Sequence, residues 1–267
     1  RRRVCRDSTV LIIKSYPAAS RRAIPRLTWG MVPPSPFLPP RAILFDHDGV
    51  LAASEVLHMQ AWEKMLLEKG IPFVRQDFPG QIGKTGPQIL DALARKHRPD
   101  LNFSAREVME WTDLKNDYYR TALRDGPGMA PFPGVREGLT RMKAMGIPAA
   151  VVSNARRGEL VAGLTATGLL SFFEAVVSRD DSPAPKPHPI HFLTACAELD
   201  VKPEECVAID DSPTGLASAL LAGIPTASVT NSFPRAQLRQ PVPGRPELTP
   251  FRIFDSMEEF FAVILGE

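Results

Sequence analysis

The chain has 267 residues, of which 44% are hydrophobic and 23% charged, and its formal net charge is +2 at pH 7. This length allows a large buried core, while the nearly balanced charge and the lack of a run of about 18 apolar residues predict neither a nucleic-acid partner nor a membrane-spanning helix. The three cysteines lack the paired spacing of a zinc site, which favours free thiols in a reducing, cytoplasmic environment.

Residues 1–40 differ in composition from the rest of the chain. They are rich in arginine, contain a single acid, Asp7, and end in a proline-rich stretch. Transit segments share this composition, but the stretch shows no amphipathic periodicity and no motif, which favours a disordered leader without a functional role.

Residues 42–45 are a short apolar run that ends in an acidic cluster, the pattern of a buried parallel strand. Three helices and no strand are predicted after it, around residues 57–66, 87–97 and 104–123, the last opening with a Ser-x-x-Glu capping box. We therefore expect residues 55–128 to form a helical cap inserted into a core made of residues 41–54 and 129–267.

In the second part of the chain, predicted helices alternate with predicted strands. Helices are predicted at 133–145, 160–164, 190–199 and 216–222, and strands at 149–152, 175–177, 207–209 and 226–229. Such alternation is typical of an α/β fold with a doubly wound, Rossmann-like parallel sheet. The prolines of residues 233–250 predict a long surface loop there.

The strongest chemical signal is Asp46-His47-Asp48-Gly49, directly after the first predicted strand. Two carboxylates at a strand end can share a Mg²⁺ site, because this cation prefers oxygen ligands. One carboxylate can also attack phosphorus while the other transfers a proton. Taken alone, the motif fits a polar turn equally well.

Three more polar groups follow predicted strands in order. Ser153 and Asn154 can bind phosphate oxygens, Lys186 can neutralise phosphate charge, and Asp210-Asp211 can complete the acidic metal site. In open α/β sheets, ligands bind at the carboxyl ends of the strands. The combination of these three groups with the Asp46 motif therefore indicates a phosphoryl-transfer site.

Residues 41 to about 232 carry these four motifs and resemble the haloacid dehalogenase superfamily. The resemblance is to the branch with a helical cap, which includes phosphoglycolate-phosphatase-like enzymes and β-phosphoglucomutase. It implies that Asp46 is the nucleophile, Asp48 the general acid and base, Ser153 a phosphoryl ligand and Lys186 a charge-balancing residue. It also implies that Asp211 binds Mg²⁺ with Asp46 and the Asp48 carbonyl.

The same resemblance extends this set in the core and in the cap. In the core, Asn154 would bind substrate and Asp210 would assist the metal. In the cap, the implied substrate contacts are His58, Lys84 and Lys115.

The chain departs from the mutase pattern at two places. Gly86 falls near the position of a phosphate-binding arginine, and the sequence from Ser153 to Ala155 is closer to the phosphatase form. His47 stands where an apolar residue is commoner, and we expect it to point away from the site without a role.

We therefore expect a Mg²⁺-dependent phosphatase that hydrolyses a small phosphorylated metabolite, such as a sugar phosphate, through an aspartyl-phosphate intermediate. A β-phosphoglucomutase-like activity is the main alternative. A phosphonate hydrolase using Lys84 as a Schiff base, or a non-catalytic binding protein, is less favoured. The expected assembly is a monomer or weak dimer.

Overall fold

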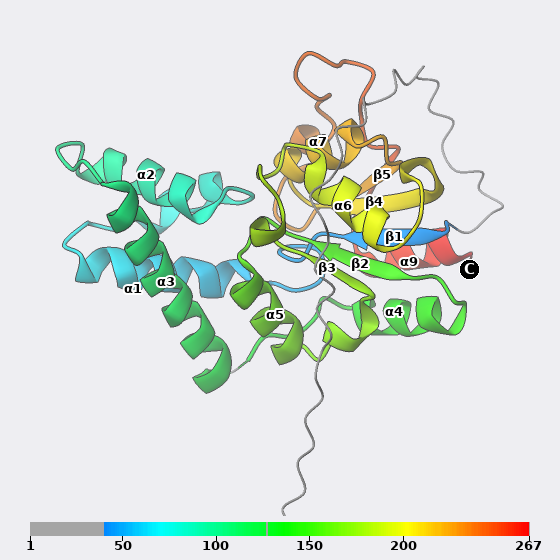
Figure 1. Ribbon diagram of the computed structural model, residues 1–267, viewed down its shortest axis with the longest axis horizontal. Coiled ribbons are helices and arrows are strands. Elements are labelled where there is room, and N and C mark those ends of the chain that lie inside the picture. The colour runs from blue at the N-terminus through cyan, green and yellow to red at the C-terminus, as the bar shows by residue number, and fades with distance from the viewer. Residues whose placement is uncertain (1–39, 127, 267) are drawn as a thin grey trace, which may run out of the picture. The chain divides into compact units, whose positions relative to one another are not determined.

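The computed structural model describes residues 40–126 and 128–266, all within one unit of residues 32–267. The predicted leader, apart from residue 40, lies outside the described residues. The described part is an α/β structure in which helices flank a parallel sheet (Figure 1). The predicted fold class is confirmed.

The described sheet has six parallel strands in the order β3-β2-β1-β4-β5-β6. The strands are β1 (Ala42–Phe45), β2 (Ala149–Val152), β3 (Ala175–Val177), β4 (Cys206–Asp210), β5 (Thr226–Val229) and β6 (Arg252–Phe254). In the centre, Leu44 is in register with Ala150 on one side and Ala208 on the other. Since the chain builds outward from β1 in both directions, the switch point of the topology lies between β1 and β4, where such sheets bind ligands.

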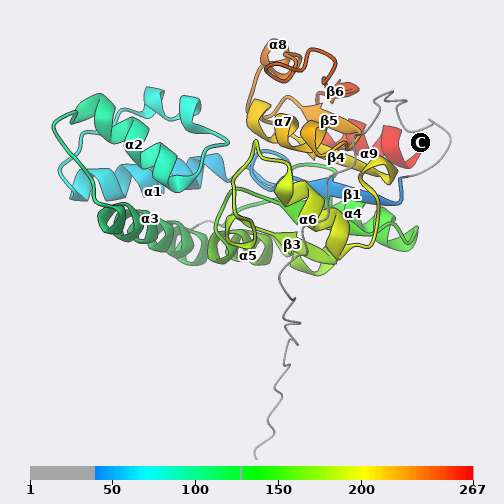
Figure 2. The same cartoon turned by 45° about the horizontal axis from the view of Figure 1, so that its top comes forward.

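Both faces of the sheet are covered, as the alternation of residues along β1 shows. Ile43 and Phe45 belong to a core cluster with side chains of α4 (Val135–Ala144), α5 (Arg157–Ala166) and α9 (Met257–Leu265). Ala42 and Leu44 belong to a second cluster with α6 (Ile190–Glu198) and α7 (Pro213–Leu221), and Figure 2 shows these layers. Burial on two faces explains why the strands are continuous apolar runs.

Three helices lie between β1 and α4 in the chain, and we call them the cap: α1 (Glu55–Glu68), α2 (Gly86–His97) and α3 (Ala105–Asp125). They share a core of their own around Trp62, Met65 and Leu90. The capping box predicted for α3 is present: Glu107 N donates to Ser104 Oγ at 3.2 Å, and Ser104 N donates to Glu107 Oε2 at 2.9 Å. The exact limits of the cap stay a prediction.

The structure adds elements near the C-terminus for which the sequence pattern gave no signal. Strand β6 and helix α9 follow residue 250, and the proline-rich stretch contains one helical turn, α8 (Arg235–Leu238). The loop prediction for 233–250 was therefore wrong at that turn. The short 3₁₀ helices are Arg75–Asp77, Pro79–Gln81, Leu170–Phe172, Arg179–Asp181 and Pro203–Glu205.

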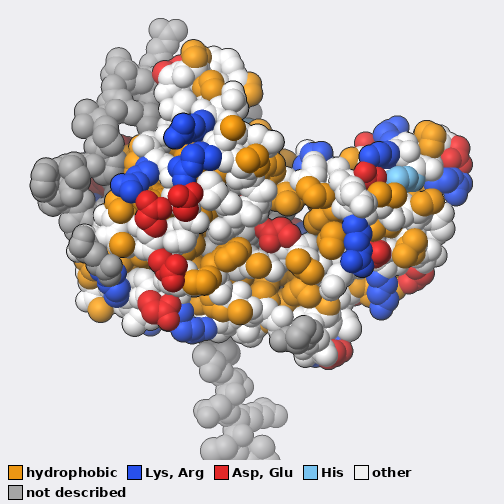
Figure 3. Space-filling view, turned by 180° about the vertical axis from the view of Figure 1, so that it is seen from behind, with side chains coloured by type: hydrophobic (Ala, Val, Ile, Leu, Met, Phe, Trp, Pro, Cys, Tyr) orange, Lys and Arg blue, Asp and Glu red, His pale blue; other side chains and the backbone are white. Residues whose placement is uncertain are grey.

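None of the described helices is both long and apolar enough to cross a membrane. On the face drawn in Figure 3, basic and acidic side chains are interspersed over the described surface. This mixture matches the small net charge of the whole chain.

Candidate active site

A cavity of about 610 Å³ opens at the carboxyl ends of the central strands. Asp46 follows β1, Ser153 follows β2, and Asp211 follows β4, and all three line this cavity together with residues of the cap. Neighbouring parallel strands end at the same edge of the sheet, which is why residues more than 100 positions apart meet here.

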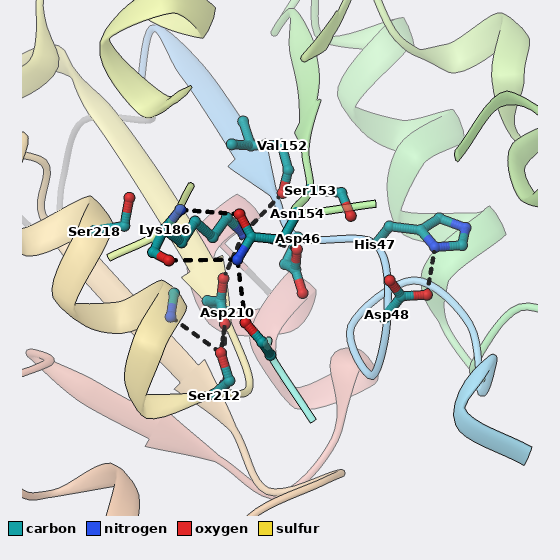
Figure 4. Close-up of polar contacts among 12 residues, drawn as sticks. Asp46, His47, Asp48, Val152, Ser153, Asn154, Lys186, Asp210, Ser212 and Ser218 are labelled. Atoms are coloured by element: carbon teal, nitrogen blue, oxygen red, sulfur yellow. Dashed lines mark hydrogen bonds and ion pairs between the residues drawn. The ribbon is translucent and has the colours of Figure 1, made fainter. Parts of the chain in front are cut away.

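Lys186 joins the two acidic segments of the site. Its Nζ lies 2.8 Å from Asp46 Oδ1, 2.8 Å from Asp210 Oδ2 and 2.8 Å from the carbonyl oxygen of Val152 (Figure 4). The ammonium group is therefore fully used as a donor. Burial alone would lower the pKa of Lys186, but the charges of Asp210 and Asp46 outweigh it and raise that pKa.

Asp46 lies in a strongly acidic environment. Burial, together with the charge of Asp210, raises its pKa to about 7, although Lys186 acts in the opposite direction. Asp211 is also buried, and burial with the charges of Asp210 and Asp46 raises its pKa well above the usual range. The surroundings therefore disfavour the ionised form of both carboxyl groups. A bound cation would stabilise that form, so the site is suited to bind one.

The acidic residues can hold a divalent metal ion. One oxygen from each of Asp46, Asp210 and Asp211 lies within 4.8 Å of the others, and among the described residues Asp211 Oδ2 is buried without a hydrogen-bond partner. Gly49 has a φ of 75°, and a Cβ built there would lie 1.8 Å from Asp211 Oδ2. This oxygen-lined space fits the hard-cation preference of Mg²⁺. The Asp48 carbonyl as a further ligand stays a prediction.

Three side chains contact Asp48, and each contact ends on Oδ1. His47 Nδ1 lies at 2.9 Å, His58 Nε2 at 3.5 Å, and the Ser54 hydroxyl donates a hydrogen bond. Burial would raise the pKa of Asp48, but His47, and then His58, lower it well below the usual range. Asp48 is thus held as an anion beside Asp46.

The expectation for His47 was wrong in one respect. Its ring is buried, and a Cβ at Gly163 would lie only 2.8 Å from His47 Cε1. The ring nevertheless contacts Asp48 directly. In the family that the sequence resembles, an apolar residue is commoner at this position, so the resemblance did not predict a contact with Asp48.

Ser153 and Asn154 continue the site after β2. The Ser153 hydroxyl accepts a hydrogen bond from the Ala155 N–H at 3.0 Å. The Asn154 carboxamide accepts from Lys186 N at 2.9 Å and donates to the Gly83 carbonyl oxygen in the cap at 3.1 Å. Asn154 therefore ties the lysine segment to the cap loop as well as lining the cavity.

The three predicted cap residues all line the cavity, in different environments. Lys84 is exposed and donates to Gln81 Oε1 at 3.0 Å. Lys115 is only 4% exposed, and its Nζ lies 2.8 Å from His58 Nδ1 and 2.8 Å from Glu159 Oε1. Glu159 also lines the cavity, and no signal in the sequence indicated it, because a glutamate in the first turn of a helix looks like an ordinary cap.

Comparison with known proteins places this site in a family. Residues 43–229 match the family model described as haloacid dehalogenase-like hydrolase. The chain belongs to this family. The expected family and the expected hydrolase activity are confirmed.

The relatives include both phosphatases and a mutase. Validoxylamine A 7'-phosphate phosphatase of Streptomyces hygroscopicus subsp. limoneus is 29% identical over 72% of this chain and 86% of its own length. β-Phosphoglucomutase of Bacillus subtilis is 27% identical over 73% of this chain and 85% of its own length. The crystal structure of CbbY from Rhodobacter sphaeroides in complex with phosphate has a TM-score of 0.70 at 25% identity, covering 83% of this chain and 96% of that one.

Proposed function

We propose that this hydrolase is a Mg²⁺-dependent phosphatase acting on a small phosphate monoester. The observation that carries the proposal is the meeting of Asp46, Asp48, Lys186 and Asp211 in one cavity. A phosphatase among the relatives supports the reaction class. A non-catalytic binding protein would have no use for a buried nucleophile, a proton-transfer group and a metal site together.

In the proposed reaction, Asp46 attacks the phosphorus atom and an aspartyl phosphate forms as the P–O bond to the leaving group breaks. Asp48 gives a proton to the departing alkoxide, so in the bound complex it must first be protonated. Water then attacks the same phosphorus atom and loses its proton to Asp48, which releases phosphate and restores Asp46. The Ser153 hydroxyl and nearby N–H groups hold the equatorial oxygens.

Charge balance follows from the residues around the nucleophile. Mg²⁺ held by Asp46, Asp210 and Asp211 would supply positive charge against the phosphate. Lys186 supplies a second positive charge beside Asp46, at 2.8 Å. Positioning and neutralisation of this kind make up most of the catalysis that phosphoryl transfer requires.

The part of the cavity formed by the cap indicates the leaving group. Beside the charged Lys84 and Lys115, this part is lined by the uncharged polar side chains of Thr85, Thr112 and Asn116 and by the aromatic ring of Trp62. Neutral donors and acceptors beside an aromatic ring suit a hydroxylated leaving group such as a sugar or cyclitol. We therefore propose a sugar-phosphate-like monoester as the substrate class.

A panel of sugar phosphates and phosphoglycolate tests this function, with release of inorganic phosphate measured in Mg²⁺ and in EDTA. We expect release from at least one sugar phosphate that stops when Mg²⁺ is removed. An Asp46→Asn protein purified in the same way controls for contaminating phosphatases. Absence of release from every ester, or release unchanged by EDTA, would contradict the proposal.

A further inference from the structure

A buried ion pair connects the cap to the core. Lys115 of α3 and Glu159 of α5 lie 2.8 Å apart, and their side chains are 5% and 7% exposed. A second pair between the same two helical regions, Arg156 and Asp113, is 45% and 54% exposed. A buried pair costs more desolvation than an exposed one, so stability alone is a poor reason for the first pair.

Glu159 is fixed at both of its carboxylate oxygens. Oε1 accepts from Lys115 Nζ, and Oε2 accepts from the backbone N–H of Arg156 at 3.3 Å, at the start of α5. Burial would raise the pKa of Glu159, but the charge of Lys115 outweighs burial and lowers that pKa. The carboxylate is therefore a rigid anchor for the lysine.

Lys115 in turn fixes the protonation pattern of a histidine ring. Its Nζ lies 2.8 Å from His58 Nδ1. An ammonium group has three donors and no acceptor, so His58 Nδ1 must be the unprotonated nitrogen and Nε2 must carry the hydrogen. The ring is also stacked on Tyr119 at 4.0 Å between centroids, with 6° between the planes, which restricts its rotation.

The protonated nitrogen lies on the side of the proposed proton-transfer group. His58 Nε2 is 3.5 Å from Asp48 Oδ1, the oxygen that Ser54 and His47 also contact. A separation of this length is common before substrate binds and shortens when the site closes. Glu159, Lys115, His58 and Asp48 thus form one continuous chain of polar contacts.

We propose that Glu159 is a positioning residue for Asp48. By holding Lys115 against His58 it selects the Nε2–H tautomer, so that His58 donates towards Asp48 Oδ1 and orients the carboxylate. The consequence for catalysis rests on the proposed function, in which Asp48 transfers the proton. The tautomer itself follows from the contacts alone.

Nitrogen NMR of the histidine rings tests the tautomer directly, without substrate or metal. The chain has five histidines, and a His58→Gln protein assigns the signals. We expect wild-type His58 to be the Nε2–H tautomer, and Glu159→Gln to convert it to a mixture of both tautomers. Asp113→Asn, which breaks the exposed pair instead, should leave the His58 signals unchanged. Retention of the pure Nε2–H tautomer in Glu159→Gln would overturn the proposal.

Kinetics of the same protein give the second readout. We expect Glu159→Gln to lower kcat about tenfold with little change in KM, because orientation of a proton-transfer group acts on the chemical step. The double variant Lys115→Met/Glu159→Gln removes both buried charges and keeps the protein folded if the single variant is unstable. Its kcat should stay low, since no lysine holds His58.

Wild-type kcat in the folded double variant would show that Glu159 only balances the charge of Lys115, and would refute the positioning role. Failure of the wild-type protein to release phosphate would refute the proposed function instead. The NMR result would still decide whether Glu159 sets the tautomer.

Discussion

Asp46 and Asp48 are two positions apart but have opposite electrostatic environments. The pKa of Asp46 is raised to about 7 by burial and by Asp210, whereas His47 and His58 lower the pKa of Asp48 against the effect of burial. Separated pKa values within one pair of carboxyl groups are typical of sites that divide two chemical roles. Taken alone, these two shifts run opposite to the proposed roles, because a nucleophile must be ionised and a general acid must be protonated. The proposed roles therefore depend on a cation that favours the ionised form of Asp46 and on protonation of Asp48 in the bound complex.

Asp46→Asn tests the nucleophile. We expect kcat to fall by at least about 100-fold with the fold intact, because an amide is a much weaker nucleophile. Wild-type protein incubated with radiolabelled substrate should retain a label that hydroxylamine removes, and the variant should not. Circular dichroism checks the fold, and a variant that keeps the labelled intermediate would rule out Asp46 as its carrier.

Removal of Mg²⁺ should have a larger effect on stability at high pH. The pKa of Asp46 is about 7 when folded against a usual value of 3.8, so the folded state binds more protons between these values. Stability without metal should therefore fall as pH rises through this window. Mg²⁺ needs the ionised carboxylates, so the increase in Tm that it produces should be larger at about pH 8 than at about pH 5.5.

Thermal unfolding in EDTA and in Mg²⁺ at both pH values measures this difference. Asp211→Asn is the matched variant, since it keeps the shape of the side chain but removes one charge from the acidic cluster. It should reduce the increase in Tm at both pH values. An increase that is the same at both pH values in the wild-type protein would contradict the assignment of the metal to these carboxylates.

The sequence was sufficient to predict individual residues of the candidate site, but not all of the residues that contact them. Asp46, Ser153, Lys186 and Asp211 could be found because each follows a recognisable strand or motif. Glu159 could not, because its partner Lys115 is 44 positions away on another helix and the contact depends on how α3 packs against α5. His47 was misjudged because its contact depends on its side-chain conformation.

The elements were predicted well where local signals agree. The start of α3 was predicted from its capping box, and the strand limits of β2, β3 and β5 from short apolar runs between glycines and polar residues. Strand β6 has three residues, and its first is an exposed arginine, so it has too little pattern to predict. It forms because β5 offers a free edge for pairing.

Ser104→Ala tests the contribution of the capping box to the cap. The variant leaves the Glu107 N–H without its side-chain acceptor, so we expect Tm to fall by about 2 to 4 °C. Ser171→Ala, at another exposed serine, serves as the control and should change Tm little. An unchanged Tm in Ser104→Ala would mean that packing against α1 alone sets the stability of this end of α3.

At the scale of the whole molecule, the sheet and the cap contribute different parts of the cavity. The sheet supplies the acidic residues and Lys186, and the cap supplies the side of the cavity that faces the leaving group. The sheet order could be predicted in outline because alternating helices and strands allow few topologies. The position of the cap over the cavity could not, since it depends on contacts such as Asn154 to Gly83 that join distant segments.

The cap also bears on whether water or a second substrate hydroxyl receives the phosphoryl group. Gly86 has no side chain near the position where the mutase pattern places an arginine, and a Cβ there would lie 2.6 Å from Thr112 Cγ2. The ammonium of Lys115 is already paired with Glu159. A bisphosphate intermediate would therefore lack a bidentate anchor in the cap, a charge-assisted contact worth about 1.5 to 3 kcal/mol.

We therefore expect hydrolysis to predominate over mutase activity. The assay supplies β-glucose 1-phosphate with a trace of glucose 1,6-bisphosphate and follows glucose 6-phosphate and inorganic phosphate together. Phosphate should appear at least as fast as glucose 6-phosphate, and omission of the bisphosphate should not slow it, because water needs no phosphorylated acceptor. A substrate that the panel shows to be hydrolysed serves as the positive control for active enzyme. Glucose 6-phosphate forming much faster than phosphate would establish the mutase in place of the phosphatase, and would mean that the cap holds the bisphosphate through residues other than Gly86 and Lys115.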